Sequence, residues 1–189
     1  MVETIIPAFE HAPEEGKIIG RLLAGYSDLE VEMLMCTDFV IGDIDMAVRE
    51  LYGTRGEFRR IQTMRQLTEA AYVGIELGPI YATTMADMDW CRQIRNQYAH
   101  CQWYYTAHEG LCFIDLEELA KQPAKIVYVT NTPLPVNVSL LSLQEAFFKH
   151  VQKCFWYLQE QYRMRTGAIR PATPLWSMPS AMAQPPAHN

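Results

Sequence analysis

The stretch MDWCRQIRNQYAHCQW, residues 88–103, holds the side chains best suited to chemistry. Read as a helix at about 100° per residue, it places Arg92, Arg95, Asn96 and His100 on one surface. A guanidinium carries a permanent charge and a planar set of donors that suits phosphate or carboxylate, and imidazole is the group whose ordinary pKa lies nearest neutrality. An amide four residues before the imidazole can orient the ring or hold a substrate oxygen.

This combination suits cleavage of a phosphodiester that supplies its own nucleophile, the ribose 2′-hydroxyl. His100 would move protons, Arg95 would neutralise charge on the phosphorus-bound oxygens, and Asn96 would orient. Such a reaction needs no metal and no cofactor, and we expect neither. The alternative is structural, because arginine, asparagine and histidine also cap and solvate helix ends.

Residues 95–100, RNQYAH, resemble the Arg-x4-His signature of the HEPN superfamily (higher eukaryotes and prokaryotes nucleotide-binding) in its Arg-Asn-x-x-Ala-His form. The resemblance implies a compact helical bundle, often a homodimer, that in many members is a metal-independent ribonuclease acting as a toxin or defence factor. It implies Arg95, Asn96 and His100 as catalytic residues and RNA or a nucleotide as the ligand. An antitoxin or regulatory protein is the further partner it suggests.

Weaker agreement, from about Ile18 to Gln102, follows an order of elements similar to that of the mannitol-repressor-like branch of the superfamily. That branch implies the rival function, a noncatalytic regulatory or interaction module that binds an anionic ligand or a protein. Cys101 stands where a small residue such as glycine or serine is commoner, so this position departs from the pattern.

Candidate substrate contacts flank the motif. Arg92 shares its surface, and Trp103 begins an aromatic run that would stack on unpaired bases unless it packs in the core. Arg59 and Arg60 lie at the expected start of another helix, where the dipole favours anions. Salt bridges to the acidic first helix are the preferred interpretation of this basic cluster, and phosphate contact is the alternative.

Composition limits the classes of function. The chain has 189 residues, 49% of them hydrophobic, which suffices for one well-buried core. Its net charge is −6, so an RNA-binding surface has to be a local basic patch. No apolar run approaches the ~18 residues that span a bilayer, and the first residues lack a signal-peptide pattern, so we expect a cytoplasmic protein with no membrane partner. Five scattered cysteines without CxxC spacing predict reduced thiols.

The apolar pattern predicts a mainly α-helical fold, and with the resemblance a HEPN-like helical bundle with a small β insertion. Residues 1–13 are expected to be an irregular lead-in, residues 14–166 a single helical domain, and residues 167–189 a proline-rich, disordered tail. Helices are predicted over 14–35, 44–52, 57–77, from about 88 to 100, and 139–165. The β insertion, at about 102–131, combines a hairpin of 102–106 with 111–115 and a third strand over 125–130.

Overall fold

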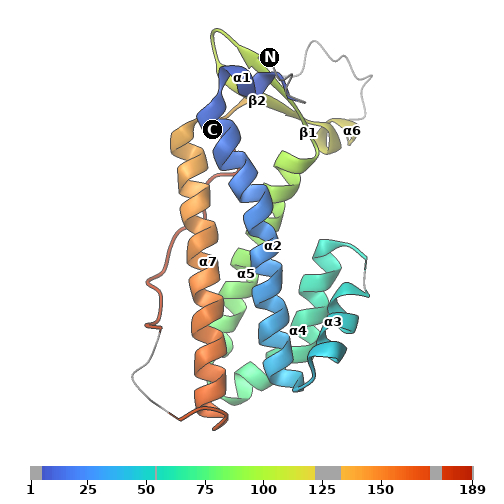
Figure 1. Ribbon diagram of the computed structural model, residues 1–189, viewed down its shortest axis with the longest axis vertical. Coiled ribbons are helices and arrows are strands. Elements are labelled where there is room, and N and C mark those ends of the chain that lie inside the picture. Colours follow the sequence, from blue (N-terminus) through green and yellow to red (C-terminus); the bar gives the residue numbers. More distant parts are fainter. Residues whose placement is uncertain (1–5, 54, 122–132, 171–175, 189) are drawn as a thin grey trace. The chain divides into compact units, whose positions relative to one another are not determined.

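The computed structural model describes residues 6–53, 55–121, 133–170 and 176–188, and it is mainly helical with a small antiparallel sheet (Figure 1). The prediction of a mainly α-helical fold with a small β insertion is thereby confirmed. By internal contacts the chain divides into two compact units. Unit 1 consists of Met1–Ala24, Gln93–Ala146 and Pro185–Asn189, and unit 2 consists of Gly25–Arg92 and Phe147–Gln184.

The predicted helices and the hairpin appear in the predicted order, and the short helices α1 and α6 were not predicted. The helices are α1 (Ala8–His11), α2 (Pro13–Ile41), α3 (Ile44–Tyr52), α4 (Glu57–Gly74), α5 (Gly78–Ala99), α6 (Leu116–Ala120) and α7 (Val138–Arg165). The strands are β1 (Cys101–Thr106), β2 (Gly110–Asp115) and β3 (Leu134–Pro135), hydrogen-bonded in the order β1-β2-β3. The first long helix extends to Ile41 rather than Met35, and α5 runs without interruption from Gly78 into the RNQYAH motif.

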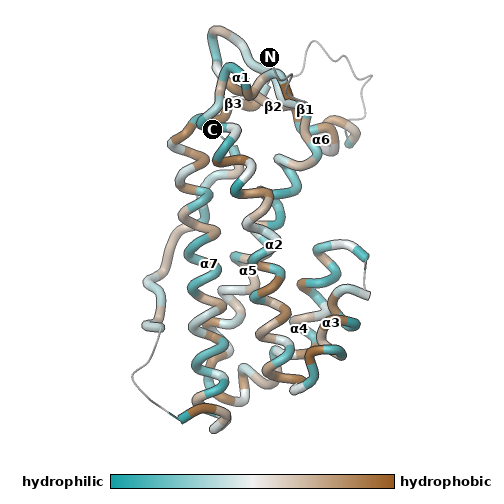
Figure 2. Tube along the Cα trace, viewed as in Figure 1, coloured by the Kyte–Doolittle hydropathy of each residue, from teal (hydrophilic) through white to brown (hydrophobic). Residues whose placement is uncertain are grey.

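Unit 2 is held together by apolar residues that recur at helical spacing. Figure 2 shows hydrophobic and hydrophilic segments alternating along α2 and α7. Each fully buried aliphatic or aromatic side chain contributes roughly 1.5–3 kcal/mol to folding. The buried set within unit 2 includes Tyr26, Leu29 and Met33 on α2, Ile61 and Met64 on α4, Met85 and Met88 on α5, and Phe147, Val151, Phe155 and Leu158 on α7.

Polar contacts fix how α2 and α7 pack within unit 2. The Glu32 carboxylate on α2 accepts hydrogen bonds from Trp156 Nε1 and from Gln159 Nε2, both at 2.8 Å. Charge-assisted hydrogen bonds of this kind are about twice as strong as neutral ones. They give the helix pair a defined register in addition to its apolar contact.

Side chains and a glycine set the helix ends. The amide N–H of Met46 donates to Asp43 Oδ1 at 3.0 Å, which caps α3, and Gly42 just after α2 has φ +75°, where glycine is favoured. The start of α7 is capped by Asn137, whose Oδ1 accepts from the Leu140 N–H at 2.9 Å. An asparagine one residue before the helix is well suited to this role.

The hairpin of unit 1 forms where the sequence predicts it. β1 pairs with β2 in antiparallel register, with Trp103 opposite Phe113, and Gly110 at φ +76° lets the chain turn back. The ring of Phe9, in α1, lies 5.4 Å from the Trp103 ring, so the lead-in covers the hairpin. The predicted strand over 125–130 lies outside the described residues, and the third strand observed is β3, opposite Cys112 and Phe113.

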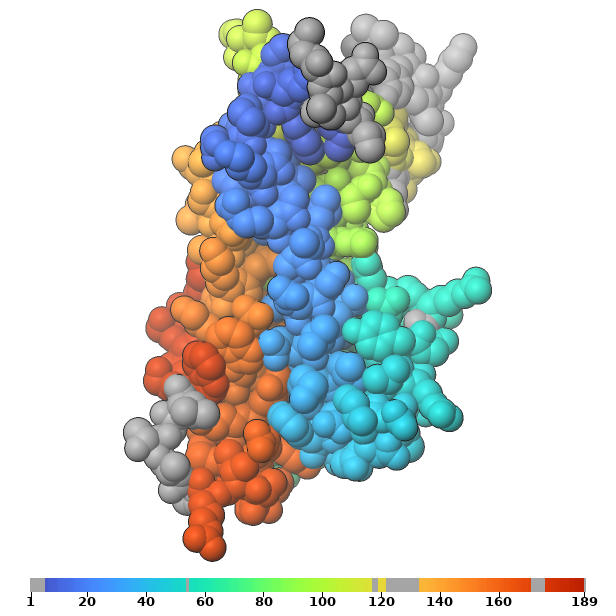
Figure 3. Space-filling view, viewed as in Figure 1, coloured from blue at the N-terminus to red at the C-terminus, as the bar shows by residue number. Residues whose placement is uncertain are grey.

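The two ends of the chain differ from expectation. The lead-in contains one helical turn, α1. Residues 176–188 of the tail make specific contacts instead of lying free. In unit 2 the Trp176 ring lies 4.5 Å from the Trp156 ring, its backbone N–H donates to Glu160, and this part of the tail lies against α7 in Figure 3. A proline-rich segment cannot form its own core, but it can be fixed by partners on a distant helix, which composition does not reveal.

Among the described residues, none of the helices is both long and apolar enough to cross a bilayer.

Candidate functional site

The RNQYAH motif occupies the last turn of α5 in unit 1. Arg95 and Asn96 are half-buried, and His100 is exposed directly after the helix ends at Ala99. The His100 N–H still donates to the Asn96 carbonyl at 3.0 Å, so the backbone keeps its helical path through His100. The helix ends where the sequence predicts the change to β structure, because Cys101 already pairs with Asp115 in the sheet.

Buried residues of α5 anchor the motif. Ile94 is fully buried and Tyr98 is 2% exposed. The Tyr98 hydroxyl donates to Gln144 Oε1 on α7 at 2.7 Å, and its ring packs edge-on against Phe113. Burial raises the pKa of Tyr98 well above its usual range, so the phenol stays protonated and keeps donating.

Within the motif, the amide holds the guanidinium. Arg95 Nη1 donates to Asn96 Oδ1 at 2.9 Å. On a helix Asn96 lies about 100° around the axis from Arg95 and His100 about 140° in the same sense. The hydrogen bond therefore turns the Arg95 side chain toward the surface on which His100 lies. The predicted role of Asn96 changes accordingly, since its oxygen orients the arginine and not the imidazole ring.

Arg60 of unit 2 is engaged by an acid. Its Nη1 lies 2.5 Å from Glu30 Oε1 on α2, with the two side chains 23% and 12% exposed, and its guanidinium stands 5.0 Å from the Tyr52 ring. Partial burial lowers the pKa of Arg60, but the hydrogen bond and charge of Glu30 give a net rise. This confirms the salt-bridge interpretation for Arg60, and it leaves the guanidinium charge already compensated. Arg59, its neighbour on α4, is exposed.

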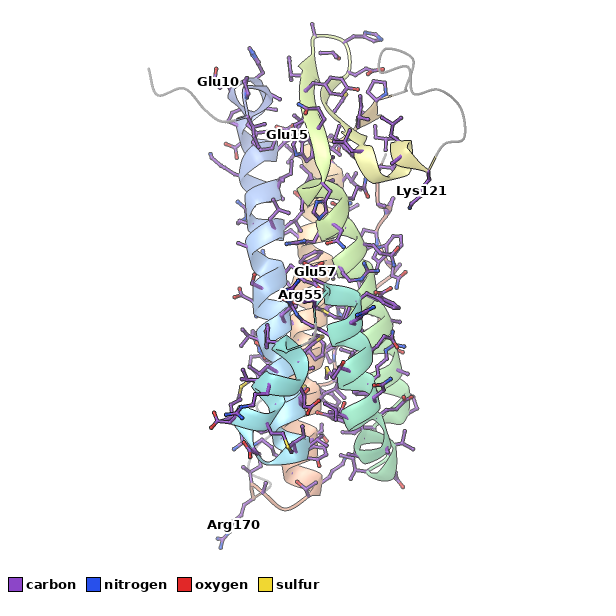
Figure 4. All side chains as sticks on the ribbon, turned by 90° about the vertical axis from the view of Figure 1, so that its right-hand side faces the viewer. Glu10, Glu15, Arg55, Glu57, Lys121 and Arg170 are labelled. Carbon is purple, nitrogen blue, oxygen red and sulfur yellow. The ribbon has the colours of Figure 1, made fainter. Side chains whose placement is uncertain are left out.

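Figure 4 shows Arg55 and Glu57 at the start of α4, where the sequence places a basic cluster beside the N-terminal end of the helix. Arg92, also in unit 2, contacts one acid and one aromatic ring, as Arg60 does. Its Nε donates to Asp89 Oδ1 at 2.8 Å and its guanidinium stands 5.4 Å from the Phe58 ring. Of the predicted site residues, Arg95, Asn96 and His100 belong to unit 1, and the arginines at 59, 60 and 92 belong to unit 2.

Trp103 belongs to the core of unit 1. It is 9% exposed, and its ring lies 5.4 Å from both the Phe9 and Phe113 rings and 5.5 Å from that of Tyr98. Buried on all these sides, it does not offer a face on which an RNA base can stack. The sequence left two roles open for Trp103, stacking on RNA bases and packing in the core. The structure shows core packing.

Sequence reasoning missed Gln144. This side chain is completely buried and accepts the hydrogen bond from Tyr98 described above. A signal was present, because Gln144 interrupts the apolar stripe of α7 between Leu140 and Phe147. A polar residue at a core position implies a buried partner, although the sequence does not say which one.

Two further findings bear on the site. Within the described ranges, no three histidine, cysteine, aspartate or glutamate side chains gather in an arrangement that could hold a metal ion. Comparison with family models, with curated proteins and with solved structures finds no match to this chain.

Proposed function

We propose that this chain is a HEPN-like protein and a metal-independent endoribonuclease that cleaves RNA phosphodiesters. Arg95 binds the non-bridging phosphate oxygens, Asn96 holds the Arg95 guanidinium, and His100 transfers the proton. The ribose 2′-hydroxyl attacks phosphorus, the bond to the 5′-oxygen of the next nucleotide breaks, and the products carry a 2′,3′-cyclic phosphate and a 5′-hydroxyl.

One observation supports this proposal above the others. The hydrogen bond from Arg95 Nη1 to Asn96 Oδ1 holds a half-buried guanidinium five residues before the exposed imidazole of His100, which directly follows the helix. A guanidinium held in advance stabilises developing charge better than a mobile one, because no reorganisation is needed when the charge appears. The imidazole, open to solvent, can exchange the transferred proton with water.

A single motif supplies one imidazole, whereas the reaction has two proton transfers, from the 2′-hydroxyl and to the leaving oxygen. We propose a homodimer that brings two motifs to one RNA strand, as the HEPN resemblance implies. Two motifs would also concentrate positive charge that one subunit with net charge −6 lacks. A toxin or defence role, with an antitoxin as partner, belongs to the same proposal.

The alternative is a noncatalytic regulatory or interaction module that binds an anionic ligand. The observation that favours it is the pairing of Arg60 with Glu30 and of Arg92 with Asp89, which compensates two of the candidate RNA contacts. The RNQYAH motif itself supplies one guanidinium, that of Arg95, which suits a small anion or an acidic protein segment better than a long RNA.

Incubation of the purified chain with mixed RNA, with and without a chelator, separates the two functions. The nuclease proposal expects cleavage that the chelator does not affect and that falls about 10²–10⁴-fold in His100→Ala. His108→Ala is the matched control, because His108 is exposed in the hairpin turn and outside the motif. Intact RNA, or equal cleavage by wild type and His100→Ala, would refute the nuclease and favour the binding module.

A further inference from the structure

The last residues of the chain are bound to unit 1 through one buried amide. Gln144 Nε2 donates to the Pro186 carbonyl at 2.8 Å and to the Ala187 carbonyl at 3.1 Å. A side-chain amide has two N–H donors, so both are taken by the tail. Pro185, next to these carbonyls, is itself buried.

The same amide contacts the motif helix. Gln144 Oε1 accepts the Tyr98 hydroxyl at 2.7 Å, and Tyr98 lies between Arg95 and His100 on α5. The two tail carbonyls determine which way the amide faces, since carbonyl oxygens can pair only with its NH₂ side. The oxygen is thereby left facing Tyr98. A chain of hydrogen bonds thus runs from the tail carbonyls through Gln144 to the RNQYAH motif.

We propose that Pro185–His188 is a strap that sets the position of the motif helix through Gln144 and Tyr98. With the strap in place Gln144 is 0% exposed, so release of the strap removes the two carbonyl partners of its N–H groups and opens the amide to water. The amide is then no longer held in one orientation, and Tyr98 loses its fixed acceptor. Tyr98 and Gln144 are positioning residues, because neither is itself one of the groups assigned to the phosphate or the proton.

Binding of the strap to Gln144 affects how well the motif is ordered, and order in the motif in turn affects how tightly the strap binds. Any partner that holds the tail away from Gln144 biases α5 toward the state in which Tyr98 has no fixed acceptor, and a ligand that orders the motif favours the bound strap. The strap is thus a built-in means of regulation. Its effect on RNA cleavage rests on the proposed function, whereas the coupling itself does not.

Hydrogen exchange measured by mass spectrometry on peptides covering residues 93–100 tests the coupling without RNA. In full-length Gln144→Ala and Tyr98→Phe, we expect these amides to exchange at least tenfold faster, while those of the β1–β2 hairpin change less than twofold. A chain ending at Gln184 should behave like Gln144→Ala. A synthetic peptide of residues 176–189 should restore protection in the shortened chain but not in Gln144→Ala.

Trp176→Ala is the matched control, because it removes a tail contact of unit 2 and leaves Gln144 untouched; exchange over 93–100 should stay within twofold of wild type. Unchanged exchange in Gln144→Ala, or an equal increase over the hairpin, would overturn the strap and leave a merely stabilising tail. Coupling without RNA cleavage would keep the strap and refute the nuclease. If the shortened chain does not fold, the two full-length variants decide the question.

Discussion

The pair of Arg60 and Glu30 decides whether a basic residue near the start of α4 serves the fold or the ligand. The perturbation is Arg60→Met, which keeps an apolar stem and removes the charge. Exposed ion pairs contribute about 0.2–1 kcal/mol, whereas breaking a buried pair costs about 3–5 kcal/mol. With side chains 23% and 12% exposed, this pair lies between these limits.

We therefore expect Arg60→Met to lower the free energy of unfolding by about 2–3 kcal/mol, including about 0.5–1 kcal/mol from the lost contact with the Tyr52 ring. For a chain of this length that loss lowers Tm by roughly 4–12 °C. Glu30→Gln should cost less, because the amide oxygen still accepts a hydrogen bond. The double variant should be less destabilised than the sum by about 1–2 kcal/mol, since the two side chains contact each other.

Urea unfolding followed by circular dichroism gives all four free energies of the cycle. Arg59→Met is the matched control, since this neighbour is exposed and its substitution should change stability by less than about 0.5 kcal/mol. A coupling below about 0.5 kcal/mol would refute the reasoning and make Arg60 available again as a phosphate contact.

Two further predictions concern stability. Burial raises the pKa of the Cys36 thiol from its ordinary 9.0 to about 12. The folded state therefore keeps a proton that the unfolded state loses, and stability falls as pH rises above 9, by about 2 kcal/mol at pH 10.5. Urea titrations at pH 8 and 10.5 should show a shallower fall in Cys36→Ala, and equal slopes would contradict the assignment. Asn137→Ala should lower stability by about 1 kcal/mol through loss of the α7 cap, whereas Ser139→Ala should have little effect; thermal unfolding that ranks the two variants in the opposite order would place the cap at Ser139.

The elements with strong periodicity could be predicted from the sequence. Ile18, Leu22, Leu29 and Met33 recur at helical spacing, and all are buried on α2. The hairpin was equally readable, because aromatic and β-branched runs flank a short segment that ends in a glycine. In both cases a local pattern determines the local structure.

Features that depend on residues far apart in the sequence could not be predicted from local patterns. Whether Trp103 stacks on a ligand or packs in a core depends on Phe113 across the hairpin and on Phe9, which is remote in sequence. The tail lacks periodicity, and its order over 176–188 comes from individual contacts such as that of Gln184 Nε2 with Asp87 Oδ1 at 2.9 Å. The amino-acid composition of a segment indicates whether it can form a hydrophobic core of its own. It does not indicate whether the segment can bind to the core of the rest of the protein.

The motif was located by its residue types, but its internal geometry was not predictable. The spacing allowed the Asn96 amide to serve either Arg95 or His100, and the structure gives its oxygen to Arg95. An i to i+1 contact needs the longer side chain to bend around the helix, which depends on the rotamer and not on the spacing.

The central claim, that Arg95 and His100 act together on an RNA phosphodiester through its 2′-hydroxyl, is tested most directly by single-turnover cleavage in the presence of chelator. The substrate is a short RNA, compared with the same strand in which every ribose 2′-hydroxyl is methylated. The account predicts cleavage of the unmodified strand alone, products ending in 2′,3′-cyclic phosphate, and a rate reduced at least a hundredfold in both Arg95→Ala and His100→Ala. Cleavage of the methylated strand, or undiminished cleavage by either variant, would contradict it.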